Sequence, residues 1–289
     1  MSHRRPVRRI RIAVATAVGL ALAAGLATTA SAIQDHHTTP ADKAKPTVVL
    51  VHGAWADAAG WTGVAKRLQA DGYTVTAPAT PLRGLGSDAA YLADYLKTIN
   101  GPVILVGHSY GGAVITNAAT GNPNVKALVY VAAFAPDKGE SIADLVGKYP
   151  GSHLSDDPNA PVPTALNAVP FTQADGSTGV DLYIKPDKYR DVFLSNRVSN
   201  SKAAALAATQ RPVTAQAVGE PSATTPAWKT IPSWYLVARD DRTIPPAAEH
   251  FMASRAHAHT TEIDGPHAVH LTDPKAVTRL IENAATTTH

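Results

Sequence analysis

Short runs of apolar residues alternate with longer amphipathic segments from Pro46 onward. The runs at 47–51, 103–106 and 127–132 are almost wholly apolar and have the length of strands, and the run at 73–77 alternates with threonine. The segments 57–71, 87–100 and 113–120 place apolar residues at helical spacing. Strands that are apolar on both faces are typical of a parallel sheet covered by helices on both sides, so we predict an α/β fold.

The pattern changes at about Pro136. Residues 137–227 contain many prolines and show weak periodicity, with two short helices predicted at 187–195 and 199–209. Because this stretch is too long for one loop of a compact domain, we predict a cap inserted over the carboxyl edge of the sheet. The alternation then resumes with strands at 233–238 and 260–263 and helices at 246–256 and 274–285.

Residues 1–32 have the features of a secretory signal peptide. Five arginines precede an apolar stretch at 12–26, and Ala30-Ser31-Ala32 supply the small residues of a cleavage site. We predict cleavage after Ala32, export by the general secretory rather than the twin-arginine route, and no membrane attachment of the mature chain. An uncleaved membrane anchor is the alternative. The polar residues 33–45 are predicted to be a flexible lead-in, so that the folded domain spans 46–289.

Cleavage changes the size and charge of the chain. Removing 32 of 289 residues leaves 257, which is enough for one large α/β domain. The removed segment holds five arginines and no acidic residue, so the formal net charge falls from +3 to −2. The mature chain therefore gives no argument for a nucleic-acid partner. The absence of cysteine excludes disulfides, zinc–thiolate sites and a cysteine nucleophile.

Residues 106–113 read VGHSYGGA and directly continue the apolar run that ends at Leu105. Gly107 and Gly111 stand two residues to either side of Ser109. A strand, the pattern G-x-S-x-G and a helix together predict a nucleophile elbow, in which the glycines let strand and helix approach closely. The helix N-terminus beneath the turn adds partial positive charge. Ser109 is therefore the predicted nucleophile.

A serine hydroxyl needs an imidazole base and a carboxylate that orients the base. In this topology both follow the serine at the ends of later strands, with the acid first. Asp241 is preferred as the acid because it stands just before the turn Arg-Thr-Ile-Pro-Pro, whereas Asp240 is expected to be solvated or paired with Arg239. His267 follows a Gly-Pro turn and is the predicted base, and His270 is expected at the surface where a helix starts.

Acyl transfer also needs donors for the developing oxyanion. The backbone N–H of Tyr110, right after the nucleophile, and that of Ala54, in the loop behind the first strand, are the predicted donors. Trp55 and His108 are candidate pocket residues, with structural hydrogen bonding as the alternative role of His108.

The segments VVLVHGAW, VGHSYGGA, DDRTIPP and DGPHAV stand in the order found in the α/β-hydrolase superfamily, which the chain resembles from about Pro46 to its C-terminus. More narrowly it resembles the group of plant methyl-ester esterases, hydroxynitrile lyases and related bacterial hydrolases, whose bacterial members are similar at ATQRPV (208–213) and PAWKTIPSWYLVA (226–238). The resemblance implies the α/β-hydrolase fold with a Ser109–His267–Asp241 triad. It also implies an oxyanion hole at Ala54 and Tyr110, and no metal or organic cofactor.

The predicted function is a secreted serine hydrolase, a carboxylesterase that cleaves small or medium esters through an acyl-enzyme intermediate. One alternative is a cofactor-independent lyase or haloperoxidase-like enzyme on the same fold. The lyases of the group carry a lysine directly after the histidine, where this chain has Ala268. The other alternative is a non-catalytic ligand-binding protein, against which a complete triad argues. The predicted partner is a small-molecule ester, and the sequence defines neither its identity nor the oligomeric state.

Overall fold

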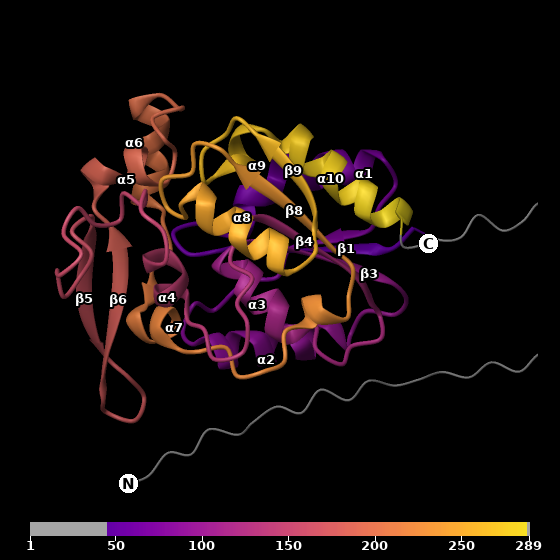
Figure 1. Ribbon diagram of the computed structural model, residues 1–289, viewed down its shortest axis with the longest axis horizontal. Coiled ribbons are helices and arrows are strands. Elements are labelled where there is room, and N and C mark those ends of the chain that lie inside the picture. Colours follow the sequence, from indigo (N-terminus) through magenta and orange to yellow (C-terminus); the bar gives the residue numbers. More distant parts are fainter. Residues whose placement is uncertain (1–44, 288–289) are drawn as a thin grey trace, which may run out of the picture. The chain divides into compact units, whose positions relative to one another are not determined.

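The computed structural model describes residues 45–287, so the predicted signal peptide at 1–32, its cleavage site and the lead-in up to residue 44 lie outside the described residues. A six-stranded sheet in the order β2-β1-β3-β4-β8-β9 forms the centre of the fold (Figure 1). All of its strand pairings are parallel. The strands are β1 (Thr47–Val51), β2 (Val75–Thr76), β3 (Val103–Ser109), β4 (Val125–Ala133), β8 (Ser233–Ala238) and β9 (His259–Ile263).

Helices cover both faces of this sheet, as the apolar strands predicted. On one face pack α2 (Leu85–Leu96), α3 (Tyr110–Ala118) and α8 (Pro246–Arg255), and on the other α1 (Thr62–Ala70) and α10 (Pro274–Thr287). Along β1, Val49 contributes to the first core and Val48 and Leu50 to the second, and all three side chains are buried. The predicted α/β fold is confirmed.

Most predicted boundaries in the sheet domain agree with the structure, and the differences have local causes. The helix predicted at 57–71 divides into a 3-10 turn, η1 (Ala58–Trp61), and α1. The turn begins where the side chain of Asp57 accepts the N–H of Ala59. The strand predicted to end at residue 106 continues to Ser109, and α3 begins at the next residue. Strand and helix are therefore joined with no intervening loop.

Most of the chain between β4 and β8 forms a second layer, seen at the left of Figure 1, whereas its last element, the 3-10 turn at 227–229, packs against α3. Its elements are α4 (Ile142–Gly147), β5 (Leu166–Thr172), β6 (Thr178–Ile184), α5 (Pro186–Val192), α6 (Asn200–Ala208), β7 (Val213–Thr214), α7 (Ala215–Gly219) and η2 (Ala227–Lys229). The strands form an antiparallel sheet in the order β5-β6-β7. Helices α5 and α6 correspond to the two predicted helices. The hairpin β5–β6 was not predicted because most of β5 is exposed, so its residues carry no hydrophobic alternation.

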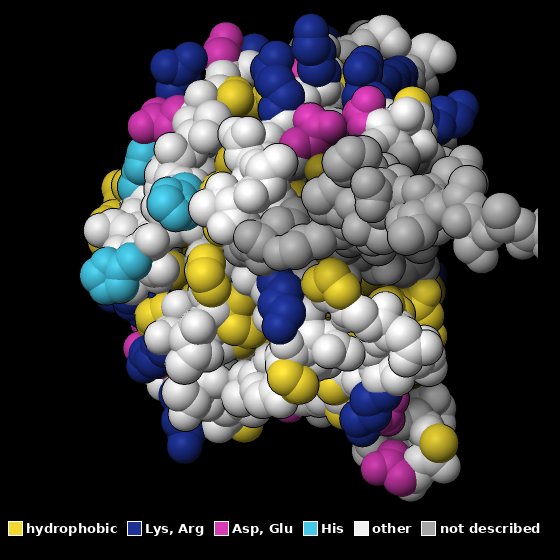
Figure 2. All heavy atoms as spheres, turned by 90° about the vertical axis from the view of Figure 1, so that its right-hand side faces the viewer, with side chains coloured by type: hydrophobic (Ala, Val, Ile, Leu, Met, Phe, Trp, Pro, Cys, Tyr) yellow, Lys and Arg dark blue, Asp and Glu magenta, His cyan; other side chains and the backbone are white. Residues whose placement is uncertain are grey.

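The surface of the described chain carries few large exposed apolar side chains, namely Tyr91 and Val169. On the face shown in Figure 2, basic and acidic side chains lie interspersed near the top and apolar side chains are scattered. Within residues 45–287, no helix combines the length and the apolar character that a membrane crossing needs.

Candidate active site

The turn between β3 and α3 holds Ser109 in an unusual backbone conformation. Its φ is 53° and its ψ is −126°, a region that non-glycine residues rarely adopt and that costs on the order of 1–3 kcal/mol. The flanking glycines permit this turn, because a Cβ on Gly107 would lie 2.6 Å from the carbonyl oxygen of Gly111. A Cβ on Gly111 would lie 2.5 Å from the carbonyl oxygen of Val51. The serine hydroxyl is thereby placed at the carboxyl edge of the sheet.

The structure brings the three predicted triad residues into hydrogen-bonding contact. His267 lies 2.9 Å through Nε2 from Oγ of Ser109 and 2.6 Å through Nδ1 from Oδ2 of Asp241. The other oxygen of Asp241 accepts the backbone N–H groups of Thr243 at 2.6 Å and Ile244 at 2.8 Å. All three side chains are buried. An imidazole with its proton on Nδ1 donates to the carboxylate and presents a free Nε2 to the hydroxyl.

Asp240 takes a different place from the one expected. It lies neither free in solvent nor paired with Arg239, because Arg197 donates to it from Nε at 2.9 Å and Arg242 lies 3.4 Å away. The same Arg197 donates from Nη2 to Asp264 at 2.7 Å. Arg197 belongs to the cap, between α5 and α6. One cap side chain thus joins the loop that carries Asp241 to the loop that carries His267.

Further cap residues hold the same two loops. The backbone oxygen of Val192 accepts the hydroxyl of Thr243 at 2.9 Å, and that of Phe193 accepts the N–H of Ala268 at 3.2 Å. The ring of Phe193 packs edge-on against the ring of His267 with 5.2 Å between centroids. The cap segment 192–197 therefore positions the loops of the acid and the base as well as covering them.

The loop behind β1 lies directly against the nucleophile. A Cβ on Gly53 would lie 2.6 Å from Cβ of Ser109 and 3.1 Å from the backbone nitrogen of Tyr110. The N–H groups of Ala54 and Tyr110, the two predicted oxyanion donors, donate to no other residue within 45–287. Both residues line the same cavity as Ser109, and free backbone donors at such a place are what an oxyanion hole requires.

Trp55 fixes this loop to the cap. Its φ of 58° lies in the left-handed region, which is strained for a bulky side chain. Its N–H donates to the carbonyl of Arg211 at 2.8 Å, its indole N–H to that of Leu182 at 2.9 Å, and its carbonyl accepts the hydroxyl of Tyr189 at 2.8 Å. These three bonds hold the strained residue and with it the neighbouring Ala54.

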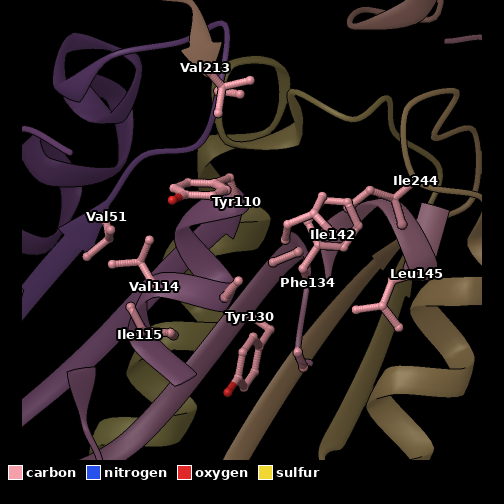
Figure 3. Packing of buried hydrophobic residues seen from close by; sticks show 14 of the residues in the cluster. Val51, Tyr110, Val114, Ile115, Tyr130, Phe134, Ile142, Leu145, Val213 and Ile244 are labelled. Atoms are coloured by element: carbon pink, nitrogen blue, oxygen red, sulfur yellow. The ribbon is translucent and has the colours of Figure 1, made fainter. Parts of the chain in front are cut away.

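A cavity of about 760 Å³ lies above Ser109, between the sheet domain and the cap. Its wall is mostly apolar, and among the described residues Asp157 is the one charged side chain that lines it. Figure 3 shows Phe134 beside Ile142 and Val213 above the ring of Tyr110. Prominent lining side chains are Trp55, Phe134, Ile142, Leu166, Leu182 and Val213. Trp55 thus lies where it was predicted.

His108 does not line this cavity, so its prediction as a pocket residue was wrong. Its ring is buried behind the nucleophile, and its Nε2 donates to the carbonyl oxygen of His267 at 2.9 Å. The alternative role, structural hydrogen bonding, agrees with this contact. Burial lowers the pKa of His108 well below its ordinary value. A neutral His108 therefore supports the backbone of the base.

The expectation for His270 was also wrong, since this residue is buried rather than at the surface. It lies on the short helix α9 (Val269–Thr272), with its ring 4.2 Å from the ring of His108 and 4.7 Å from that of Trp61. The backbone of Gly60 leaves room for the ring, because a Cβ there would lie 3.0 Å from Nε2. Burial lowers the pKa of His270 to about 3, with the nearby His267 as a lesser cause.

Donor groups suited to a metal are not gathered anywhere in residues 45–287, since no three His, Asp or Glu side chains lie in an arrangement that would hold an ion. The polar groups at the site are instead the hydroxyl of Ser109, the imidazole of His267, the carboxylate of Asp241 and the backbone N–H groups of Ala54 and Tyr110.

Comparison with known proteins gives a consistent result for most of the chain. Residues 48–280 match the sequence profile of the Alpha/beta hydrolase family. The chain is 28% identical over 265 residues to the alpha/beta hydrolase nvfD of Aspergillus novofumigatus. This alignment covers 83% of this chain and 97% of that protein. The chain is also 28% identical over 235 residues to a pyrethroid hydrolase of Sphingobium wenxiniae, covering 77% and 78%.

A shorter match with higher sequence identity and one solved structure complete the comparison. A carbendazim-hydrolysing esterase of a Nocardioides species is 36% identical over 113 residues, which span 35% of this chain and 47% of that esterase. An extracellular alpha/beta-hydrolase from a Paenibacillus species, with structural and functional homology to tobacco salicylic acid binding protein 2, superposes with a TM-score of 0.63 at 26% identity. That superposition covers 83% of this chain and 99% of the Paenibacillus protein.

The buried His270 makes the fold sensitive to acid. Below about pH 6.5 the unfolded chain binds a proton at this residue, whereas the folded chain does not until about pH 3. The free energy of unfolding therefore decreases as the pH falls through this window, by up to ~1.4 kcal/mol per pH unit for one histidine. We expect His270→Phe to reduce the slope of the free energy of unfolding against pH, obtained from urea unfolding curves at pH 7, 6, 5 and 4. The exposed His259→Phe is the control, and an equal change of slope in both variants would contradict the assignment.

Proposed function

Because the chain belongs to the Alpha/beta hydrolase family, we propose that it is a secreted serine carboxylesterase with Ser109, His267 and Asp241 as its catalytic triad. One observation carries the proposal: His267 lies 2.9 Å from the hydroxyl oxygen of Ser109 and 2.6 Å from the carboxylate of Asp241. The similarity to an esterase and to a pyrethroid hydrolase supports the cleavage of ester bonds.

In the proposed acylation step, Nε2 of His267 takes the proton of Ser109 as Oγ attacks the ester carbonyl carbon. The carbonyl oxygen becomes an oxyanion, which accepts hydrogen bonds from the N–H groups of Ala54 and Tyr110. The imidazolium is oriented and stabilised by Asp241. It then returns its proton to the leaving alkoxide, so the alcohol departs and the acyl group stays on Ser109.

In the deacylation step, His267 takes a proton from water, and the resulting hydroxide adds to the acyl carbon. Collapse of the second tetrahedral intermediate breaks the bond to Ser109 and releases the acid, and the proton returns to the serine oxygen. No group other than the triad, the two backbone donors and water is needed. The residue after the base is Ala268, a buried side chain without charge, so no cation stands there to stabilise a cyanide leaving group.

The cavity supports a particular class of ester. Its wall is mostly apolar, and of residues 45–287 no lysine, arginine or histidine lines it and Asp157 is the one charged lining residue. An anionic substrate would enter without a cation to pair with it, which is unfavourable in a largely apolar site. A volume of about 760 Å³ lies in the range of pockets for drug-sized molecules. The proposed substrate is therefore an uncharged ester with a bulky apolar group.

Export is part of the proposal. The basic and then apolar residues before Ala32 support it, and the similar Paenibacillus protein is extracellular.

The proposed triad predicts that substitutions at the adjacent residues Asp240 and Asp241 differ strongly in their effect on kcat. We expect Ser109→Ala to lower kcat for p-nitrophenyl acetate by ~10⁴–10⁶ and to abolish labelling by a fluorophosphonate probe, because the nucleophile is lost. Asp241→Asn should lower kcat by ~10⁴, because the base then loses its orienting carboxylate. Asp240→Asn is the matched control and should cost far less, since the side chain of Asp240 pairs with Arg197 and Arg242 and not with His267. Full activity of Ser109→Ala would refute the proposal.

The pocket wall should select esters by size. Val218 on α7 lines the cavity, and Val218→Trp would fill part of it. We expect kcat/KM for p-nitrophenyl esters of bulky aryl acids to fall at least ~10-fold relative to the acetate. Val169→Trp, on the exposed strand β5, is the control and should leave the ratio unchanged. An unchanged ratio in Val218→Trp would show that the bulky group binds elsewhere.

Secretion can be tested on the full-length chain. Expressed in a host with a general secretory pathway, it should appear in the medium or periplasm with Ile33 as its first residue, as read by N-terminal sequencing. A cell-associated protein that retains residues 1–32 would instead indicate an N-terminal anchor.

A further inference from the structure

One buried carboxyl group near the site has no role in the mechanism above. Glu249 on α8 has no exposed surface. Its Oε2 accepts the backbone N–H of Ala238, the last residue of β8, at 3.0 Å. Its Oε1 is also buried and receives no hydrogen bond from any other group within residues 45–287. A glutamate is almost never fully buried without a partner, so this position needs an explanation.

Glu249 and Asp241 bond to the same residue, Ala238, whose N–H donates to Oε2 of Glu249 and whose carbonyl oxygen accepts the backbone N–H of Asp241 at 3.0 Å. The two carboxyl groups are therefore neighbours, and the charge of Asp241 acts on the pKa of Glu249. Within residues 45–287, neither carboxyl group forms an ion pair with an arginine or a lysine, and the partner of Asp241 is His267. The imidazole of His267 contacts Asp241, and the other titratable neighbour of Glu249 is Tyr235 on β8, whose hydroxyl bonds to the backbone oxygen of Ala133. Two adjacent carboxylates cannot both remain ionised in a buried region with no cation of their own.

Asp241 is the member of the pair that is equipped to stay ionised. It accepts two backbone N–H groups, from Thr243 and Ile244, and the imidazole N–H of His267. Glu249 accepts one backbone N–H through one oxygen only. Three hydrogen bonds to charged Asp241 favour its ionised form, so the proton belongs on Glu249.

We propose that Glu249 is protonated at neutral pH and donates a hydrogen bond through Oε1 to the carboxylate of Asp241, and so acts as a positioning residue for the acid of the triad. This inference rests on the proposed function for its catalytic consequence. The donated bond occupies a lone pair of Asp241 and holds its carboxylate in the orientation that faces His267. The proton stays on Glu249 throughout the reaction, and no bond is made or broken there.

The protonation energetics agree with this geometry. Burial raises the pKa of Glu249 well above its ordinary value, and the carboxylate of Asp241 raises it further. Since the unfolded chain loses this proton above about pH 4.3, the associated stability is full below that pH. It decreases as the pH rises toward the folded-state pKa of Glu249. The amide of a Glu249→Gln variant does not titrate, so this dependence of stability on pH should be absent from that variant.

Glu249→Gln and Glu249→Leu form the decisive pair of variants. Glutamine reproduces the protonated acid, because its oxygen can accept the N–H of Ala238 while its amide donates to Asp241. We expect Glu249→Gln to keep kcat within ~3-fold of the wild type, whereas Glu249→Leu lowers kcat ~10–100-fold with little change in KM, as expected for loss of a hydrogen bond to a charged group. Equal losses in the two variants, or full activity of Glu249→Leu, would overturn the proposal.

Two further measurements keep the test decisive if Glu249→Leu fails to fold. The infrared difference between wild type and Glu249→Gln at neutral pH should contain the C=O stretch of a protonated carboxylic acid, and its absence would refute the proposal. The denaturation midpoint of Glu249→Gln minus that of the wild type should become larger as the pH rises from 5 to 9, because the wild type loses stability over this range and the variant does not. Glu140→Gln is the matched control, because Glu140 is held as an ion pair by Arg255 at 2.7 Å. An equal gain in the control would also refute the proposal.

The outcome is separable from that of the proposed function. If the wild-type protein is not labelled by a fluorophosphonate at Ser109, the esterase proposal fails. The infrared band and the pH dependence of the denaturation midpoint still report whether Glu249 holds a proton beside Asp241.

Discussion

The close approach of β3 and α3 at Ser109 is the constraint on which the rest of the site depends. The backbone reverses within one residue, and this is possible only because Gly107 and Gly111 present no Cβ to the neighbouring chain. Strand β3 pairs with β1 on one side and with β4 on the other, so the strained turn is anchored at the centre of the sheet. The loop behind β1 lies against the same turn through Gly53. Ser109 and the backbone N–H groups of Ala54 and Tyr110 are therefore positioned by one packing arrangement of backbone on backbone.

The acid and the base depend on a second arrangement, which involves the cap. Their loops leave adjacent parallel strands, β8 and β9, and so begin at one edge of the sheet. Arg197 joins the two loops through Asp240 and Asp264, where its charge is partly exposed to solvent. On the buried side, the proposed proton on Glu249 replaces a cation. Asp241 thus has two different kinds of neighbour. On one side lie the partly exposed ion pairs of Arg197, and on the other lies the buried and, as proposed, neutral Glu249. This arrangement keeps a single negative charge beside the imidazole.

Much of the sheet domain was predictable because its strands are apolar on both faces and its helices are amphipathic. Ser109, Asp241 and His267 were predicted to come together from the pattern G-x-S-x-G and from loops that follow later strands. Their side chains do lie in contact, since the parallel topology brings those loops to one edge. The buried place of His270 was not predictable, because it depends on space left by Gly60 on a distant turn. Likewise, nothing near Asp240 in the sequence indicates Arg197, which comes from another layer. The hairpin β5–β6 was missed because an exposed antiparallel pair has no core-facing alternation.

The burial of His267 limits where a proton on its imidazole ring can go. Its ring packs against the rings of His108 and Phe193 at centroid distances of 4.7 and 5.2 Å, its Nδ1 is engaged by Asp241, and it has no exposed surface. The one face left open is that of Nε2, which points toward Ser109. In the proposed mechanism a proton held by the ring can therefore leave only toward the reacting atoms. While a substrate occupies the cavity, that proton is kept from bulk water and committed to the departing group.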